Sequence, residues 1–352
     1  MFDILLFILV LSVIILVHEL GHFICAKFFG VYVIEFSLGF GPTLLKYQGK
    51  ETKYSLRIIP FGGFVSMLGE ENQESIAGVD VTRYLTGINR FKRIIIMLGG
   101  IIMNFALALV LLIGVSIANP IEVISPEATI RVVVENSPAA LAGLQAGDEI
   151  VKLESVNGDV VEPSDFYDIT RFLSLYSDND TIIFTVDRAN ERLEIPITPQ
   201  LIETDNKYFF GISNPDVTYR NLSFSESINA GVNVFVDSFK DIFLVFGMLF
   251  SGRGLENLSG PIGIYQVTSQ AASYGVATFL QFIALISLNV GIFNALPIPI
   301  FDGGRVVILT IEAIINKPLS EKVINAAMMA SVVLIIALLV FTTFNDLSRI
   351  FS

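Results

Sequence analysis

Residues 4–28 read ILLFILVLSVIILVHELGHFICAKF, and this stretch decides the fold. A helix needs about 20 mainly apolar residues to cross the roughly 30 Å hydrocarbon core of a bilayer, so the segment predicts a transmembrane helix. It also carries His18, Glu19 and His22 near its end. Ionisable side chains are costly inside a membrane and mark functional sites there, so the segment predicts a site as well as a span.

The composition extends this interpretation to the whole chain. Of the 352 residues, 53% are hydrophobic and only 16% are charged, which is typical of a chain that lies largely in lipid. The formal charge of -12 excludes nucleic acid as an expected partner, because phosphate binding needs clustered Lys and Arg. We expect an α-helical polytopic membrane protein whose four transmembrane helices cover residues 4–28, 94–118, 276–296 and 327–344.

The distribution of charge predicts which side each segment faces. Residues 27–93 contain 9 Lys and Arg against 6 Asp and Glu, whereas residues 119–275 contain 9 against 22. Basic loops stay in the cytoplasm, so the acidic region and both termini are expected outside. This topology brings the end of the first span and the end of the third to the same, cytoplasmic face.

The segments between the spans have patterns of their own. Residues 31–68 alternate in polarity and contain two glycine pairs, which predicts a membrane-associated β-hairpin region dipping toward the site. Residues 121–200 combine short strand patterns with a helix at 165–176 capped by Ser164, which predicts an inserted α+β domain. Residues 223–250 are apolar but interrupted by charges, so we expect an amphipathic interfacial helix, followed by a link at 251–254.

These interpretations divide the chain into seven parts. They are the first transmembrane helix (1–28), the cytoplasmic or re-entrant β region with its linker (29–92), the second transmembrane helix (93–118), the external domain (121–200), the external amphipathic helix and linker (201–275), the third transmembrane helix with the helix that follows it (276–316), and the fourth transmembrane helix (320–346).

The sequence His18-Glu19-Leu20-Gly21-His22 has the HExxH spacing of zinc proteases. Positions i and i+4 lie on the same face of a helix, so both imidazoles can bind one metal ion, expected to be Zn²⁺. Glu19 can then act as the general base that takes a proton from zinc-bound water. Both histidines of the chain fall in this motif, which argues against a chance occurrence.

A catalytic zinc usually has three protein ligands, and Asp302 is the expected third. It follows Pro297 and Pro299, which prevent regular helix at the cytoplasmic end of the third span. The irregular backbone there needs hydrogen-bond partners, which an unwound substrate strand can supply. The alternative role for Asp302 is an N-cap for the helix that starts near Gly303.

The chain resembles the site-2 protease family of intramembrane zinc metalloproteases, and within it the bacterial regulator-of-sigma-E protease type. The resemblance covers nearly the whole sequence. It rests on HExxH, on NxxPxPxxDG from Asn294 to Gly303, and on the spacing Gly100 to Asn104. It also rests on three shorter glycine motifs at 39–42, 62–65 and 260–263. Phe301 stands where the family commonly has Leu before the metal-binding Asp.

The resemblance implies the activity and several partners. It implies a multi-pass protein of the bacterial inner membrane that cleaves single-pass membrane proteins, such as trimmed anti-sigma factors, and signal peptide remnants. It also implies a single periplasmic PDZ domain with the signature at 137–148 and a possible affinity for peptide C-termini. The substrate-binding residues that it implies are Asn294, Pro297, Pro299, Gly62, Gly63 and Asn104.

Two other classes of function remain open from the sequence. An ion or proton transporter would need a chain of ionisable residues through the bilayer, and the second and fourth spans provide none in their depth. A catalytically silent PDZ scaffold would bind peptides by strand addition, but it would have no need of Glu19. Bound zinc would separate the enzyme from both classes.

Overall fold

The computed structural model describes residues 2–70, 76, 78–156, 158–176, 180–202, 207–216, 218–250 and 258–351. The chain forms two compact units. The helical unit contains residues 1–119 and 224–352, and the β-rich unit runs from Pro120 to Ser223. The 251–254 link expected after the amphipathic helix lies outside the described residues.

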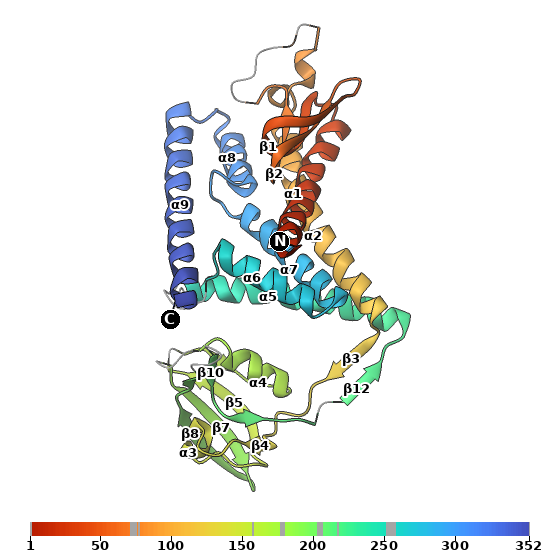
Figure 1. Cartoon of the computed structure of the whole chain (residues 1–352). Helices are drawn as coiled ribbons and strands as arrows, with labels where there is room; N and C mark the ends of the chain where they lie inside the picture. Colours follow the sequence, from red (N-terminus) through yellow and green to blue (C-terminus); the bar gives the residue numbers. More distant parts are fainter. Residues whose placement is uncertain are drawn as a thin grey trace. The chain divides into compact units, whose positions relative to one another are not determined.

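Among the described residues, four helices are long and apolar enough to cross a membrane, which confirms the expected number. They are α1 (Phe2–Phe28), α2 (Arg90–Ala118), α7 (Val276–Ala295) and α9 (Glu321–Phe351) (Figure 1). Helices α1, α2 and α9 contain their expected apolar stretches and begin before them, whereas α7 ends one residue before its expected end. Asn89 caps α2, because its side-chain oxygen accepts a hydrogen bond from the Lys92 amide at 2.8 Å.

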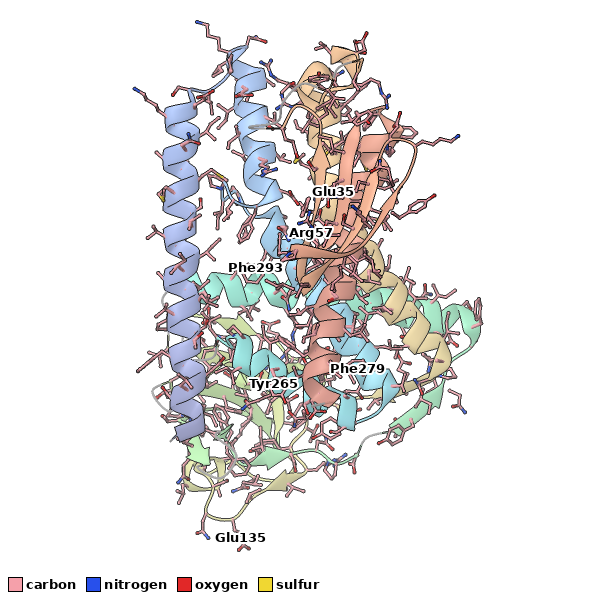
Figure 2. The ribbon with its side chains drawn as sticks, turned by 45° about the horizontal axis from the view of Figure 1, so that its top comes forward. Glu35, Arg57, Glu135, Tyr265, Phe279 and Phe293 are labelled. Atoms are coloured by element: carbon pink, nitrogen blue, oxygen red, sulfur yellow. The ribbon has the colours of Figure 1, made fainter. Side chains whose placement is uncertain are left out.

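The β-hairpin consists of β1 (Val33–Gln48) and β2 (Lys53–Met67), which pair antiparallel with several register shifts. Figure 2 shows Glu35 and Arg57 on these strands, where an ion pair of 2.7 Å joins them. Lys53 pairs with the same carboxylate at 3.1 Å. The base of the hairpin packs on the end of α1 and the start of α2 in a core of Ala26, Val31, Val33, Val65, Met67, Leu85, Ile96, Met97 and Leu309.

Two helices cross the direction of α9 in Figure 1: α5 (Phe224–Phe250) and α6 (Pro261–Ser273). The first covers the segment that was expected to form an amphipathic interfacial helix, and its aromatic residues pack on α2 and α7, as between Phe239 and Phe105. The second was expected only as linker. It begins at Pro261 because proline fits the first turn of a helix, where no backbone donor is needed.

The N-terminus of α6 is held by Asp346 of α9. The buried carboxylate accepts hydrogen bonds from the amides of Gly260, Ile262 and Gly263 at 3.0, 3.1 and 2.9 Å. These amides are donors that the helix itself leaves unsatisfied, so the bond set is an interhelical cap. These bonds attach one end of α9 to the start of α6, whereas most of α9 is exposed.

The β-rich unit contains a four-stranded antiparallel sheet of order β6-β5-β7-β8. Its strands are β5 (Glu149–Ser155), β6 (Val160–Val161), β7 (Ile182–Arg188) and β8 (Glu191–Ile197). Helix α4 (Phe166–Leu173) and the short helix α3 (Pro138–Ala142) pack in the same core. The pairing of β7 with β8 is as expected from the sequence.

Short strands complete this unit and extend it beyond Gln200, where the sequence predicts its end. They are β3 (Ile121–Ile124), β4 (Val132–Val133), β9 (Gln200–Ile202), β10 (Lys207–Phe209), β11 (Ile212–Ser213) and β12 (Thr218–Asn221). Strand β12 pairs with β3, so the last residues of the unit return to its first. The expected cap of α4 was wrong by one residue: Asp165 accepts the capping bond, and the Ser164 hydroxyl instead donates to Asp168.

Candidate metal centre

Helices α1 and α2 cross where Gly21 of α1 meets Gly99 of α2, so no side chain separates the two backbones. A Cβ atom at Gly21 would lie 2.1 Å from the carbonyl oxygen of Gly99, and one at Gly99 would lie 2.7 Å from the carbonyl oxygen of Gly21. Small residues at such a crossing let two helix backbones touch directly. The contact places the HExxH face of α1 against α2.

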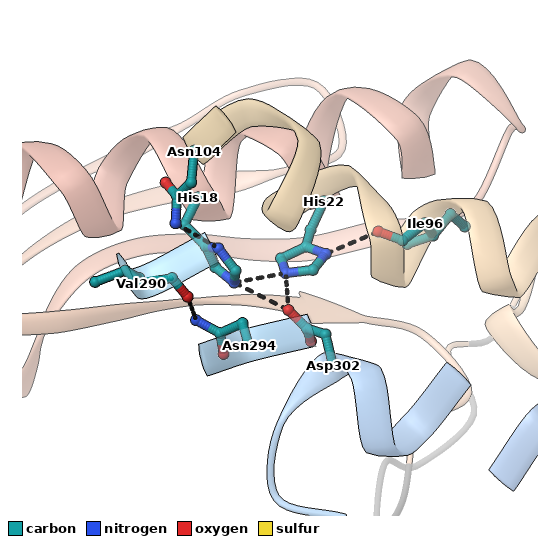
Figure 3. A network of polar contacts seen from close by, with 7 residues as sticks. All are labelled: His18, His22, Ile96, Asn104, Val290, Asn294 and Asp302. Atoms are coloured by element: carbon teal, nitrogen blue, oxygen red, sulfur yellow. Dashed lines mark hydrogen bonds and ion pairs between the residues drawn. The ribbon is translucent and has the colours of Figure 1, made fainter. Parts of the chain in front are cut away.

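His18, His22 and Asp302 meet at this crossing (Figure 3). The Nε2 atoms of His18 and His22 lie 3.0 and 3.2 Å from the same Oδ2 atom of Asp302. The two Nε2 atoms are 3.2 Å apart, and one ligand atom from each of the three residues lies within 4.8 Å of the others. Both histidines are buried, with 8% and 5% of their surface exposed, so three donors converge at one interior point.

The remaining nitrogen of each imidazole faces α2. His22 Nδ1 lies 2.8 Å from the carbonyl oxygen of Ile96. His18 Nδ1 lies 3.2 Å from the side-chain nitrogen of Asn104. These Nδ1 contacts fix the orientation of both rings, with their Nε2 atoms directed at Asp302.

Asp302 reaches the histidines because α7 stops at Ala295 and the chain turns back. Residues 296–301 form turns, since Pro297 and Pro299 cannot supply the amide donors of a helix. Helix α8 (Asp302–Ile315) then begins with Phe301 as its N-cap residue and without a side-chain cap bond. The alternative interpretation of Asp302 as an N-cap was therefore wrong.

The two glycines after Asp302 allow this return. A Cβ atom at Gly303 would lie 2.2 Å from the carbonyl oxygen of Ala295, and one at Gly304 would lie 2.1 Å from that of Ile298. A side chain at either position would push α8 away from the turn. The first turn of α8 is consequently set by direct backbone contact.

Glu19 lies beside the histidines on α1 and meets the β-hairpin. A Cβ atom at Gly63 would lie 3.2 Å from Cγ of Glu19. Strand β2 therefore passes directly over this carboxylate. A ligand that added to β2 here would lie next to Glu19.

The other expected binding residues occupy different surroundings. Gly62, with φ 101°, lies against the ring of Phe40. Asn294 donates to the Val290 carbonyl oxygen at 2.9 Å, and Figure 3 draws it beside Asp302. Pro297 is exposed and Pro299 partly so. Of the six expected substrate-binding residues, only Asn104 is fully buried. Its side chain contacts His18 and does not reach an open surface.

The arrangement fits a zinc ion. Two imidazoles and one carboxylate are the ligand types and the number that catalytic zinc sites use. A Cβ atom at Gly100 would lie 2.5 Å from Nε2 of His22 and 2.8 Å from Nε2 of His18, so the glycine keeps the space beside these nitrogens free. The sequence motifs pointed to the three donors. They did not reveal the Ile96 carbonyl contact, because a backbone acceptor has no sequence signature.

Comparison with known proteins agrees with this geometry. The profile of Peptidase family M50 matches residues 6–338. A Clostridium perfringens relative named as a zinc metalloprotease is 36% identical over 96% of both chains. The zinc metalloprotease RasP of Shouchella clausii is 30% identical over 98% of this chain and 99% of its own length. The regulator of sigma-W protease RasP of Bacillus subtilis is 28% identical over 98% of both chains.

The matched family and the donor cluster lead to the same chemistry, and the matches cover almost the full length of this chain and of its relatives. These comparisons give no support to the two alternative functions, a catalytically silent PDZ scaffold and an ion or proton transporter. The chain belongs to peptidase family M50, the site-2 protease family, and is a zinc metalloprotease.

Proposed function

We propose that this protein is an intramembrane endopeptidase in which His18, His22 and Asp302 hold the zinc ion and Glu19 is the general base. The observation that carries the proposal is the convergence of three ligand atoms within 4.8 Å of one another, next to Glu19 on the same helix. Two of these residues lie in a helix apolar enough to cross a membrane. The reaction is therefore assigned to the interior of the bilayer.

Each residue of the site has a separate task. When bound, zinc supplies a Lewis acid that lowers the pKa of water to about 7 and polarises the scissile carbonyl. Glu19 accepts the proton of the attacking water and donates it to the leaving amide nitrogen. The Asp302 carboxylate and the two imidazoles fix the reacting centre relative to Glu19.

We infer that the substrate binds as an extended strand along β2, near Gly62 and Gly63. A peptide must leave its helical conformation before its carbonyl groups can be reached, and the edge of a sheet offers hydrogen bonds for the exposed backbone. The contact of Gly63 with Glu19 supports this position. Asn294 lies beside Asp302 in Figure 3, and we assign it, together with Pro297 and Pro299 of the turn that follows α7, to the other side of the strand.

The proposed substrates are single-pass membrane proteins of the anti-sigma factor type, with signal peptide remnants as a second group. The printed name of the Bacillus subtilis relative, a regulator of sigma-W protease, supports the first group. The charge distribution supports an inner-membrane protein with its termini and β-rich unit in the periplasm and the metal centre near the cytoplasmic face.

We further propose that the β-rich unit is a PDZ domain that restricts access to substrates. As a size filter it would exclude intact ectodomains, and as a peptide sensor it would capture a newly exposed C-terminus. The pairing of Ile124 with Thr218 suggests a clean deletion. Replacing residues 125–217 by Asn-Gly closes the β3–β12 ladder with a two-residue hairpin turn.

The deletion variant should keep its zinc, and the two roles differ in the substrate that it cleaves. A size filter predicts that it cleaves full-length substrate, which the intact protein spares. A peptide sensor predicts that it loses cleavage of pre-trimmed substrate. Unchanged rates for both substrates would refute both roles.

The test of the proposed reaction is Glu19→Gln. An amide cannot accept the proton of water, whereas the three ligands remain, so the variant should bind one zinc per chain and lose cleavage of a co-expressed membrane substrate. Glu321→Gln, an exposed carboxylate at the start of α9, is the control and should cleave normally. Near wild-type cleavage by Glu19→Gln would show that another group is the base.

A further inference from the structure

Asn104 is the most deeply buried polar side chain beside the metal centre. It has 0% of its surface exposed, and its side-chain nitrogen lies 3.2 Å from Nδ1 of His18. Among the described residues, its Oδ1 atom has no hydrogen-bond partner. A buried polar atom without a partner usually reports a functional constraint or an amide drawn in the reversed orientation.

The chemistry of His18 decides between the two orientations. Its Nε2 atom faces Asp302 and His22, so ligation requires the lone pair on Nε2 and the proton on Nδ1. With the proton on Nδ1, the side-chain nitrogen of Asn104 would place a donor against a donor. Rotating the carboxamide by half a turn exchanges its nitrogen and oxygen and presents Oδ1 to the Nδ1 proton.

His22 is a useful comparison, because its Nδ1 atom faces a backbone carbonyl group, which cannot act as a donor in any orientation. Its Nδ1 atom lies 2.8 Å from the Ile96 carbonyl oxygen, which can only accept. His22 must therefore carry its proton on Nδ1 and its lone pair on Nε2. Ile96 and Asn104 lie on the same helix, eight residues apart. If the Asn104 oxygen is the acceptor, each imidazole donates its Nδ1 proton to an oxygen atom of α2.

We propose that Asn104 is a positioning residue of the metal centre: its side-chain oxygen accepts the Nδ1 proton of His18 and keeps the Nε2 lone pair available to zinc. This inference rests on the proposed role of His18 as a ligand. It replaces the expected contact of Asn104 with substrate, for which the buried side chain offers no surface.

Helix α7 holds Asn104 in place. The Ser287 hydroxyl donates to the Asn104 backbone oxygen at 2.9 Å. A Cβ atom at Gly291 would lie 3.4 Å from Cβ of Asn104, so the backbone of α7 passes close to this side chain. The ring orientation of His18 is thus linked through α2 to the helix that leads into Asp302.

The test compares Asn104→Asp with Asn104→Leu in the full-length protein, with zinc affinity measured by competition against a chromophoric chelator. An ionised aspartate can only accept, so Asn104→Asp should bind zinc as tightly as the unmodified protein. Asn104→Leu removes the acceptor and should weaken binding by roughly 10- to 100-fold, the usual cost of losing an outer partner of a ligand. Leu112→Ala creates a packing defect two turns along α2 and should leave zinc affinity unchanged.

The outcomes separate this inference from the proposed reaction. If Asn104→Asp loses zinc affinity, the oxygen is not the acceptor and the inference fails, even where the Leu variant does not fold. If Asn104→Leu binds zinc normally while His18→Ala does not, the inference fails and the ligand assignment stands. If His18→Ala keeps full zinc affinity, the proposed metal site itself is wrong.

Discussion

Replacing Gly100 by alanine would put a methyl group between the two metal-facing imidazoles. The new Cβ atom would lie 2.5 Å from Nε2 of His22, where ordinary contact begins near 3.4 Å, so one of the two groups must retreat by about 0.9 Å. Neither ring can turn away freely, because the Ile96 carbonyl and Asn104 hold their other sides. Metal–ligand distances tolerate changes of only about 0.2 Å.

The expected cost follows from this mismatch. Inserting a methyl group into a packed interior costs about 1 to 3 kcal/mol. If the strain falls on the ligands, zinc affinity drops by about 5- to 150-fold, since each 1.4 kcal/mol is a factor of ten. The measurement is zinc competition on detergent-purified protein, together with a thermal unfolding curve in excess chelator.

Gly114→Ala is the matched control on the same helix. A Cβ atom at this position meets nothing within 4 Å, so zinc affinity should stay unchanged and stability should not fall, since alanine favours the helix over glycine. Wild-type zinc affinity in Gly100→Ala would refute the assignment of the space beside the two Nε2 atoms to the metal.

Three further changes test other contacts. Asp302→Asn should lower zinc occupancy as well as cleavage, unlike Glu19→Gln, and full zinc content with normal turnover would contradict its role as a ligand. Asp346→Ala leaves the amides of Gly260, Ile262 and Gly263, two of them buried, without their acceptor and should destabilise the helical unit by about 1.5 to 3 kcal/mol, with increased hydrogen exchange at these three amides while zinc remains bound; unchanged exchange there would rule out the interhelical cap. Burial raises the pKa of Asp148, but hydrogen bonds from Arg188 and the Gln145 amide outweigh it, and the pKa lies below its usual value. Because the folded pKa is depressed, this stabilisation is complete above the unfolded pKa of about 3.9 and is lost as the pH falls through the folded value. The protection of the amides of residues 120–223, measured relative to their intrinsic exchange rate at each pH, should therefore fall below about pH 4, and Arg188→Gln should lower it already at neutral pH; equal protection in both proteins at every pH would refute the contribution.

Local patterns were enough to predict the four candidate spans and the three residues of the donor cluster. Hydropathy alone located all four candidate spans, since each is a long uninterrupted apolar run. The HExxH spacing placed two imidazoles on one helical face. The charge bias of the loops then predicted that Asp302 lies on the same side of the membrane as His22, although it follows His18 by 284 residues in the sequence.

Contacts between distant backbones were beyond such patterns. Nothing in the neighbourhood of Gly21 shows that it faces Gly99, and the residues after Gln200 pair with β3 only through a long return of the chain. Helix α6 was missed because Gly260 and Pro261 resemble a linker, while the carboxylate that caps it lies on α9. The identity of the β-rich unit as a PDZ domain stays a prediction.

The distance along the chain between His18 and Asp302 has a consequence for biosynthesis. The two proposed ligands on α1 leave the ribosome early, but the proposed third ligand exists only after α7 has been made and has turned back into α8. A nascent chain therefore has only two of the three donors during most of its synthesis, and two imidazoles hold a metal ion more weakly than the full set. Proteolytic competence thus appears only when membrane insertion is nearly complete. Under the proposed intramembrane activity, the enzyme would in this way be kept inactive while its own unfinished helices lie beside it.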